Sequence, residues 1–256
     1  DRNYLDTSLV ECYRRYGITF DNASVLNEDG NFCEMPVLAD WYDVLQESTD
    51  TKHLAVVLAR YVTGSASAMG SRNEIDLDNK YIVIDTSGMP DDLLLPGIFW
   101  ATDIANDLIS GAGGQLSALI SDELWSLVGA NSNPLAAGYI QEMVKTIRGL
   151  GGIAITSTQG MQDLFSLDNG KYGKGILDSS RIKIVMQMEE QEARLIQNVL
   201  NLSEEEVRQI TRFRRGEGLL CIGYNHVPIA FYATQKEYDA ITTSPTDLLN
   251  RKEREA

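Results

Sequence analysis

Two adjacent carboxylates close an apolar run in the middle of the chain. Residues 116–123 read LSALISDE and end in Asp122 and Glu123. A short apolar run predicts a buried strand, and open α/β sheets bind ligands at the carboxyl ends of their strands. Successive side chains on a strand point to opposite faces, so these acids cannot face one another across a substrate as a glycosidase pair does.

The same arrangement suits a nucleotide site. Asp122 can hold the shell of a magnesium ion, while Glu123 at the strand end polarises the attacking water. Taken alone, the segment is equally compatible with two acids that end a strand and cap the following helix.

Two further polar residues flank the next apolar run, residues 152–159 (GIAITSTQ). Gln159 ends this run, so a neighbouring strand would place its amide beside the acids, where it can orient a water or sense a γ-phosphate. The alternative is a local hydrogen bond at the strand end. Arg148 precedes the run and could serve a neighbouring subunit as an arginine finger. Its local sequence alone favours an arginine that interacts with a helix C-terminus.

The elements that position these residues alternate between strands and helices. Helical patterns separate four apolar runs, at residues 81–85, 116–123, 152–159 and 181–188. This rhythm predicts a parallel sheet with helices on both faces. Residues 218–224 and 227–233 then predict an antiparallel pair at one edge. Capping boxes are expected at Ser203 with Glu206 and at Thr234 with Glu237.

The predicted α/β core has a helical segment in front of it. Residues 1–75 carry apolar side chains at helical spacing, residues 76–245 form the α/β part, and residues 246–256 form a polar tail.

Composition narrows the functional classes. The net charge of −15 argues against a dominant nucleic-acid-binding surface. Cys12, Cys33 and Cys221 form no CxxC pair, which indicates neither a zinc site nor a disulfide framework and favours a reducing cytosolic setting. No apolar run approaches the ~18 residues that span a bilayer.

Several longer sequence segments, which follow one another along the chain, resemble a known family. DELW, KTIRGLGGIAITSTQGMQDLF, KYGKGILDSSRIKIVM and ITRFRRGEGLL resemble the VirB-four-type ATPases (VirB/TraC/TrbE-like) of conjugative type IV secretion systems, most closely the Gram-positive conjugation members. The resemblance covers most of residues 40–240. These proteins are similar to hexameric RecA-like motors, which include the VirD-four coupling proteins, HerA and FtsK.

The resemblance implies roles for the four candidate residues. Asp122 and Glu123 match the Walker B acids, Gln159 matches the sensor glutamine, and Arg148, eleven residues before Gln159, matches the finger arginine. The implied cofactors are ATP and Mg²⁺, with Asp122 and Gln159 at the nucleotide and Asp122 holding the magnesium through water.

It also implies an architecture and a setting. The fold is the RecA-like P-loop NTPase sheet of a C-terminal ATPase domain, in part, and residues 1–75 match a helical insertion. The implied partners are further copies in a hexamer and other secretion components, with DNA left open. The location is cytoplasmic and at most peripheral at the membrane, through partners and without insertion.

One required motif is missing from the chain. A Walker A loop reads GxxxxGK followed by Ser or Thr, whose amides cradle the phosphates. Lys171 after Gly170 is followed by Tyr, and Lys174 after Gly173 is followed by Gly. The chain is therefore expected to start after this loop, and by itself neither to hydrolyse ATP nor to bind it tightly.

Two other functions compete with a secretion ATPase. One is a DNA translocase or coupling protein of the FtsK/HerA type, and the other is a non-catalytic assembly scaffold with a RecA-like fold. The arginines of residues 212–218 (RFRRGEG) could contact nucleotide or a partner, but a solvated turn is the favoured interpretation.

Overall fold

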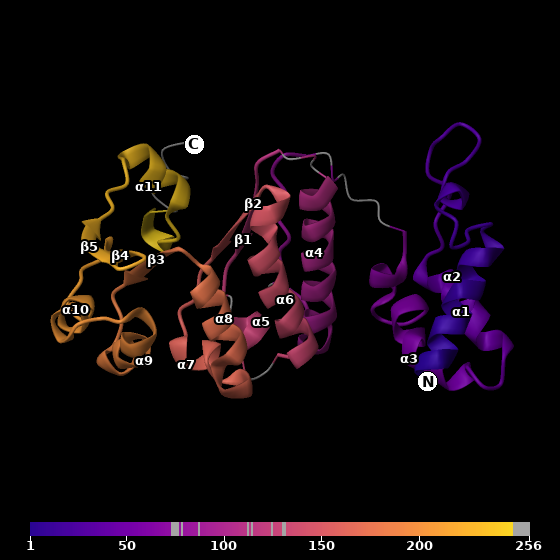
Figure 1. Cartoon of the computed structure of the whole chain (residues 1–256), viewed down its shortest axis with the longest axis horizontal. Coiled ribbons are helices and arrows are strands. Elements are labelled where there is room, and N and C mark those ends of the chain that lie inside the picture. The colour runs from indigo at the N-terminus through magenta and orange to yellow at the C-terminus, as the bar shows by residue number, and fades with distance from the viewer. Residues whose placement is uncertain are drawn as a thin grey trace. The chain divides into compact units, whose positions relative to one another are not determined.

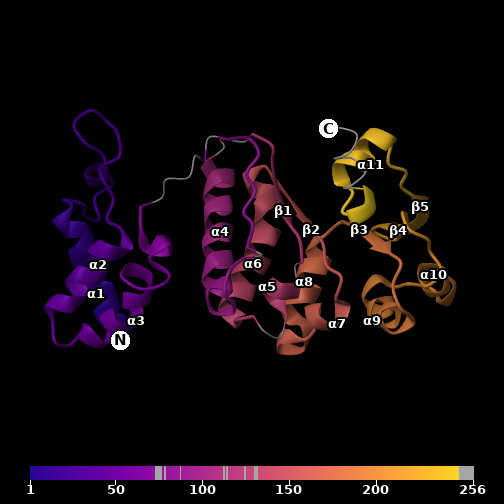
Figure 2. The ribbon, with the colours of Figure 1, turned by 180° about the vertical axis from the view of Figure 1, so that it is seen from behind.

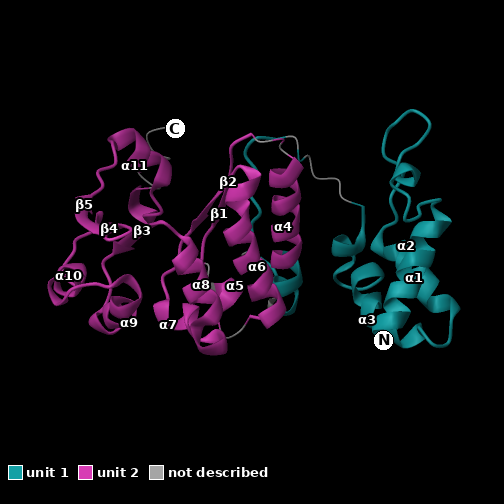
Figure 3. Cartoon of the chain, viewed as in Figure 1, with its two compact units in different colours: residues 1–97 teal, residues 98–256 magenta. Residues whose placement is uncertain are grey.

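The computed structural model describes residues 1–72, 77, 79–86, 88–111, 113, 115–123, 125–129 and 132–247. Within them the chain forms two compact units, Asp1–Gly97 and Ile98–Ala256, with the division inside helix α4 (Asp91–Gly111) (Figure 3). The domain boundary predicted near residue 75 and most of the predicted tail, residues 248–256, lie outside the described residues.

The N-terminal unit is helical, as the apolar spacing predicts. Its elements are α1 (Arg2–Arg15), η1 (Asn22–Val25), α2 (Leu38–Glu47), α3 (Lys52–Val62) and η2 (Ser67–Gly70) (Figure 1). Cys12, Leu45 and Ala55 are buried between the three α-helices. The indole Nε1 of Trp41 donates to Ser8 Oγ at 2.9 Å, which ties α2 to α1. Residues 81–85, predicted to be a strand, form no strand in the structure.

The C-terminal unit contains every strand of the described residues. Its elements after α4 are β1 (Ser117–Ser121), α5 (Trp125–Val128), α6 (Pro134–Thr146), η3 (Ile147–Leu150), β2 (Gly152–Thr156), α7 (Met161–Leu164), η4 (Leu167–Gly170), α8 (Lys171–Ser179), β3 (Ile182–Met186), α9 (Glu190–Leu200), α10 (Glu204–Ile210), β4 (Glu217–Ile222), β5 (Asn225–Ala230) and α11 (Gln235–Ile241).

Strands β1 and β2 form a parallel pair, in register from Ser117 opposite Gly152 to Ser121 opposite Thr156. A side chain at Gly152 would lie 2.6 Å from Ile147, so this position needs a glycine for the strand to pack on η3. The opposite face of the pair carries Ile120 and Ile155, which are 67% and 50% exposed. Within the described residues, helices therefore cover one face of the pair and not both.

The predicted fourth strand belongs to a different sheet. Strand β3 pairs antiparallel with β4, and β4 pairs antiparallel with β5. The β4–β5 hairpin was predicted correctly. Helices α9 and α10 lie on one side of this sheet and α11 on the other (Figures 1 and 2). A buried cluster that includes Val185, Ile196, Ile210 and Leu219 fills the space between the sheet and the first two helices.

Local signals at two helix starts are confirmed. Ser203 Oγ accepts from the Glu206 amide while Glu206 Oε2 accepts from the Ser203 amide, and Thr234 and Glu237 form the same box. Of the helices in the described residues, none combines the length and the hydrophobicity that a membrane span requires.

Candidate active site

The candidate site lies where β1 and β2 end together. The Ser157 amide donates to Ser121 O at 3.0 Å, which continues the parallel pairing one residue beyond the last strand pair. This pairing places the segment after β1 directly beside the segment after β2. Asp122 and Glu123 on the first segment therefore meet Ser157 and Gln159 on the second.

The carboxylate of Asp122 is oriented through one of its oxygens. Oδ1 accepts a hydrogen bond from Ser157 Oγ and a second, of 3.0 Å, from the Glu123 amide. Within the described part of the chain, no hydrogen bond to Oδ2 accompanies these two. The side chain is exposed at the sheet edge. Asp122 is thus an exposed carboxylate oriented through one oxygen, and the second oxygen can serve a hydrated cation.

Glu123 has an unusual backbone conformation. Its φ is +53°, in the left-handed region, which costs a residue other than glycine about 1–3 kcal/mol. Ser126 donates to the Glu123 carbonyl through its amide at 2.9 Å and its hydroxyl at 2.8 Å, which holds the turn. Strained residues of this kind cluster at functional sites, because the surrounding structure must hold them in place.

Gln159 holds the Glu123 side chain. Its Nε2 donates to Glu123 Oε1 at 2.8 Å. The two acids therefore bond to different residues of the neighbouring segment, Asp122 to Ser157 and Glu123 to Gln159. The left-handed turn at Glu123, and not strand alternation, brings both acids to this segment. The structure brings together three of the four predicted site residues, and their roles in catalysis stay predictions.

Ser157 is a site residue that the sequence analysis did not single out. Two features of the sequence could have indicated it. These are the Ser and Thr residues before Gln159 and the equal lengths of the two apolar runs, which end at neighbouring positions. Only the register, with Ser121 opposite Thr156, shows that Ser157 and not Thr158 reaches Asp122.

Arg148 is separated from the other three residues. It lies exposed in η3, before Gly151 (φ +82°) turns the chain into β2. Arg148 therefore precedes the amino end of β2, whereas Gln159 follows its carboxyl end. Five strand residues rise about 16 Å in all, so Arg148 is at the opposite edge of the sheet from this chain's own acids.

Neither glycine–lysine pair forms a phosphate loop. Gly170 and Lys171 lie at the junction of η4 and α8, and Gly173 and Lys174 lie inside α8. A phosphate loop joins a strand to the start of a helix, and the element before α8 is a 3₁₀ turn. The glycine-rich residues 110–118 fall partly outside the described residues.

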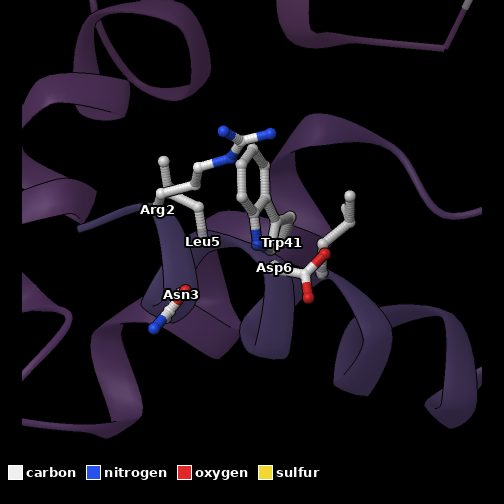
Figure 4. A pocket seen from close by; sticks show the side chains of 6 residues that line it. Arg2, Asn3, Leu5, Asp6 and Trp41 are labelled. Atoms are coloured by element: carbon white, nitrogen blue, oxygen red, sulfur yellow. The ribbon is translucent and has the colours of Figure 1, made fainter.

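Two surface hollows are lined by residues other than the candidate site residues. One, of about 410 Å³, is lined by residues of α1 and by Trp41 (Figure 4). The other, of about 570 Å³, is lined by Glu189, Glu190, Gln191 and Arg194. Neither contains a candidate catalytic residue.

The residues at this edge fit a magnesium ion in their chemistry. Asp122 and Ser157 offer oxygen atoms, which Mg²⁺ prefers, and Mg²⁺ is commonly held by one or two carboxylates together with water and phosphate oxygens. No group of three or more His, Cys, Asp or Glu residues in the described chain could hold a metal on its own. A magnesium ion at Asp122 would therefore depend on water and a nucleotide for its other ligands.

The family to which the chain is matched gives the class of this protein, a P-loop NTPase. The model of the TraG P-loop domain matches residues 36–249, most of the chain, and the chain belongs to this family. A search of curated proteins gave no match.

A solved structure supports the same assignment. The chain is similar to the structure of VirB4 of Thermoanaerobacter pseudethanolicus, with 25% identity and a TM-score of 0.77. The similarity covers 92% of this chain and 64% of the other, so the chain spans less than two thirds of that protein. These findings confirm the predicted fold class and the resemblance to VirB-four-type ATPases.

Weaker similarities link the chain to a viral enzyme. The genome packaging NTPase B204 from Sulfolobus turreted icosahedral virus 2 matches at 18% identity in its sulfate complex, with a TM-score of 0.45, over 71% of this chain and 88% of that one. Its ATP-gammaS complex matches with a TM-score of 0.42, over 59% of this chain and 66% of that one. Both scores are too low to add to the assignment.

Proposed function

We propose that this chain is the Walker B part of an ATPase that energises conjugative DNA transfer through a type IV secretion system. The observation that carries the proposal is the strand-end pairing of Asp122 with Ser157 and of Glu123 with Gln159, inside a domain of the TraG P-loop family. The comparisons do not favour the translocase of the FtsK/HerA type or the non-catalytic scaffold.

The proposed cofactors are ATP and Mg²⁺. Asp122 would hold the magnesium through water, while Ser157 and the Glu123 amide fix its carboxylate through Oδ1. The bound magnesium would supply charge neutralisation at the phosphates. Glu123 orients the attacking water, and Gln159 positions the Glu123 carboxylate at 2.8 Å and contacts the nucleotide.

Arg148 fits a role between subunits. Its position before β2, on the edge opposite its own acids, supports a role at a nucleotide in another subunit's site. We therefore propose self-association, as a hexamer, with the Arg148 guanidinium stabilising charge on the phosphoryl group in trans. Other secretion components are the further proposed partners, and they would hold the protein at the cytoplasmic face of the membrane.

The experiment replaces one carboxylate by its amide. In a longer chain that carries a GxxxxGK(S/T) loop with these residues, Glu123→Gln is expected to lower ATP turnover by about 100-fold or more while ATP affinity stays within about twofold. Phosphate release measures turnover, and calorimetric titration measures affinity. The matched control is Glu142→Gln, an exposed glutamate on α6, which should keep normal turnover.

Near-normal turnover in Glu123→Gln would refute the assigned role. The 256 residues alone should show neither hydrolysis nor ATP binding in the micromolar range, because they contain no sequence of the form GxxxxGK(S/T). Tight binding of ATP to this chain would show that the phosphates are held elsewhere.

A further inference from the structure

An arginine-rich turn joins α10 to β4, and the proposed ATPase chemistry makes no use of it. Residues 207–216 contain four arginines and no acid, in a protein whose net charge is −15. Arg208 pairs with Glu205 at 3.2 Å on α10 itself. The remaining three, Arg212, Arg214 and Arg215, are exposed and follow the end of the helix.

The backbone of this turn is fixed. Glu217 Oε2 accepts from the Arg214 amide at 2.8 Å, and the Glu217 amide donates to Arg214 O at 2.9 Å. Gly216 has a φ of +86°, and its carbonyl accepts from the Phe231 amide at 2.7 Å. Phe213 packs against the buried cluster beneath the sheet. The turn is therefore held from both sides, and its arginines project from a defined backbone.

The three guanidinium groups lack acidic partners among the described residues. Several other exposed arginines form ion pairs, such as Arg14 with Glu11, Arg72 with Glu34 and Arg194 with Glu204. Arg2, Arg148 and Arg181 form none among the described residues, but they are scattered along the chain and do not form a cluster. The nearest carboxylate in sequence, that of Glu217, is used to bind the Arg214 amide. Attraction to the C-terminus of α10 explains a positive charge at Arg212, but such attraction falls off within one turn and leaves Arg214 and Arg215 unexplained.

Aromatic side chains lie next to this charge. The hydrogen bond from Phe231 to Gly216 brings the end of β5 against the turn, and Phe231 and Tyr232 are 53% and 89% exposed. Arginines that bind a phosphate backbone, combined with exposed aromatic rings that stack on bases, are the features of surfaces that bind single strands without sequence preference.

We propose that the turn of Arg212, Arg214 and Arg215, with Phe231 and Tyr232, is a binding surface for single-stranded nucleic acid. The guanidinium groups contact successive phosphates, and an aromatic ring stacks on a base. The net negative charge of the protein limits binding elsewhere on its surface and confines the strand to this turn. The surface involves none of the four candidate catalytic residues, so this proposal can be tested independently of the proposed ATPase activity.

The experiment measures the salt dependence of binding to the complete 256-residue chain. Fluorescence anisotropy follows a labelled oligo-dT of roughly 20 nucleotides, longer than the usual footprint of one binding surface. Three phosphate contacts predict a slope of log K against log salt of about −2, or an affinity loss of about 18-fold between about 50 and about 200 mM NaCl. The triple variant R212Q/R214Q/R215Q should weaken binding at low salt by about tenfold or more and lose most of this slope.

The control variant R14Q/R72Q/R194Q removes the same charge from arginines that are already paired, and it should bind the oligonucleotide as the unchanged chain does. Tyr232→Ala should weaken oligo-dT about fivefold or more while leaving the salt slope unchanged. Because Tyr232 is 89% exposed, this variant should keep its fold, which circular dichroism verifies.

Three results would overturn the proposal. The first is no binding of oligo-dT at about 50 mM NaCl. The second is an equal loss of oligo-dT affinity in the two triple variants, which would show that binding depends only on the net charge of the protein. The third is equal affinity for a duplex of the same length or for inorganic tripolyphosphate, together with an unchanged Tyr232→Ala variant, which would indicate a general anion site.

Discussion

The two sheets of the C-terminal unit differ in how their apolar side chains are covered. In the antiparallel sheet, Leu219 is 1% exposed, and α9 contributes Ile196 at 2% against the same face. In the parallel pair, Ile153 and Ile155 of β2 are 55% and 50% exposed. Both sheets contain apolar β-strand residues, and the difference lies in which helices pack on them.

The part of the unit that contributes most to stability therefore differs from the part that carries the candidate catalytic residues. The antiparallel sheet packs one face on a closed core and exposes the other, where Ile182 and Ile184 of β3 are 61% and 49% exposed. The candidate catalytic residues lie at the end of a parallel pair whose covered face is only partly buried among the described residues. Parallel sheets are ordinarily buried on both faces. We infer that substitutions will be costly to the fold in the first sheet and costly mainly to activity at the end of the second.

The largest effect on stability is expected in the antiparallel core. Leu219→Ala removes a fully buried side chain and should destabilise the region by about 2–5 kcal/mol. Ile155→Ala, a matched change on the exposed face of β2, should cost about 1 kcal/mol or less. Hydrogen exchange with mass spectrometry, on peptides that cover β4 and β2, measures both locally. Equal losses of local stability in the two variants would show that the two sheets do not differ in this way.

A smaller effect is expected where the antiparallel sheet meets the arginine turn. A side chain at Gly216 would be strained at φ +86° and would lie 2.9 Å from Phe231 O. Gly216→Ala should therefore cost about 1–3 kcal/mol. Gly149, before β2, has open space around it, so Gly149→Ala should be neutral or slightly stabilising. Thermal unfolding compares the pair, and a neutral Gly216→Ala would show that the turn is not fixed.

The smallest effect concerns pH and the capping box beneath the antiparallel sheet. Burial of Glu206 acts to raise its pKa, but the Ser203 amide and hydroxyl and the His226 ring, 2.7 Å away, outweigh this and lower the pKa. The resulting stability is present above the ordinary glutamate value near 4.5 and is lost as the pH falls through the lowered pKa of the folded state.

Glu206→Gln should consequently destabilise the chain by about 1 kcal/mol at neutral pH. The difference from the unchanged chain should shrink as the pH falls below about 4.5. Urea unfolding followed by circular dichroism at several pH values gives this difference. A difference that stays constant down to the acid limit would mean that the Glu206 carboxylate carries no such role.

Local sequence predicted much of the secondary structure. The helices of the N-terminal unit, the β4–β5 hairpin and the capping boxes at Ser203 and Thr234 follow from interactions over a few residues, which spacing and residue type reveal. Residues 81–85 show the limit of such patterns. Their β-branched run has the composition of a strand, but a strand requires a partner that pairs with it, and composition does not specify one.

The sequence by itself determined which residues could do chemistry. The order of Asp122, Glu123, Arg148 and Gln159, with the surrounding strings, was sufficient to predict the family that the comparisons confirm. Tertiary structure alone decided that Ser157 binds Asp122, that Arg148 lies at the opposite edge, and that β3 runs antiparallel to β4. The physical reason is that register and strand direction are set by hydrogen bonds between distant segments, and an apolar run of alternating residues is compatible with several such pairings.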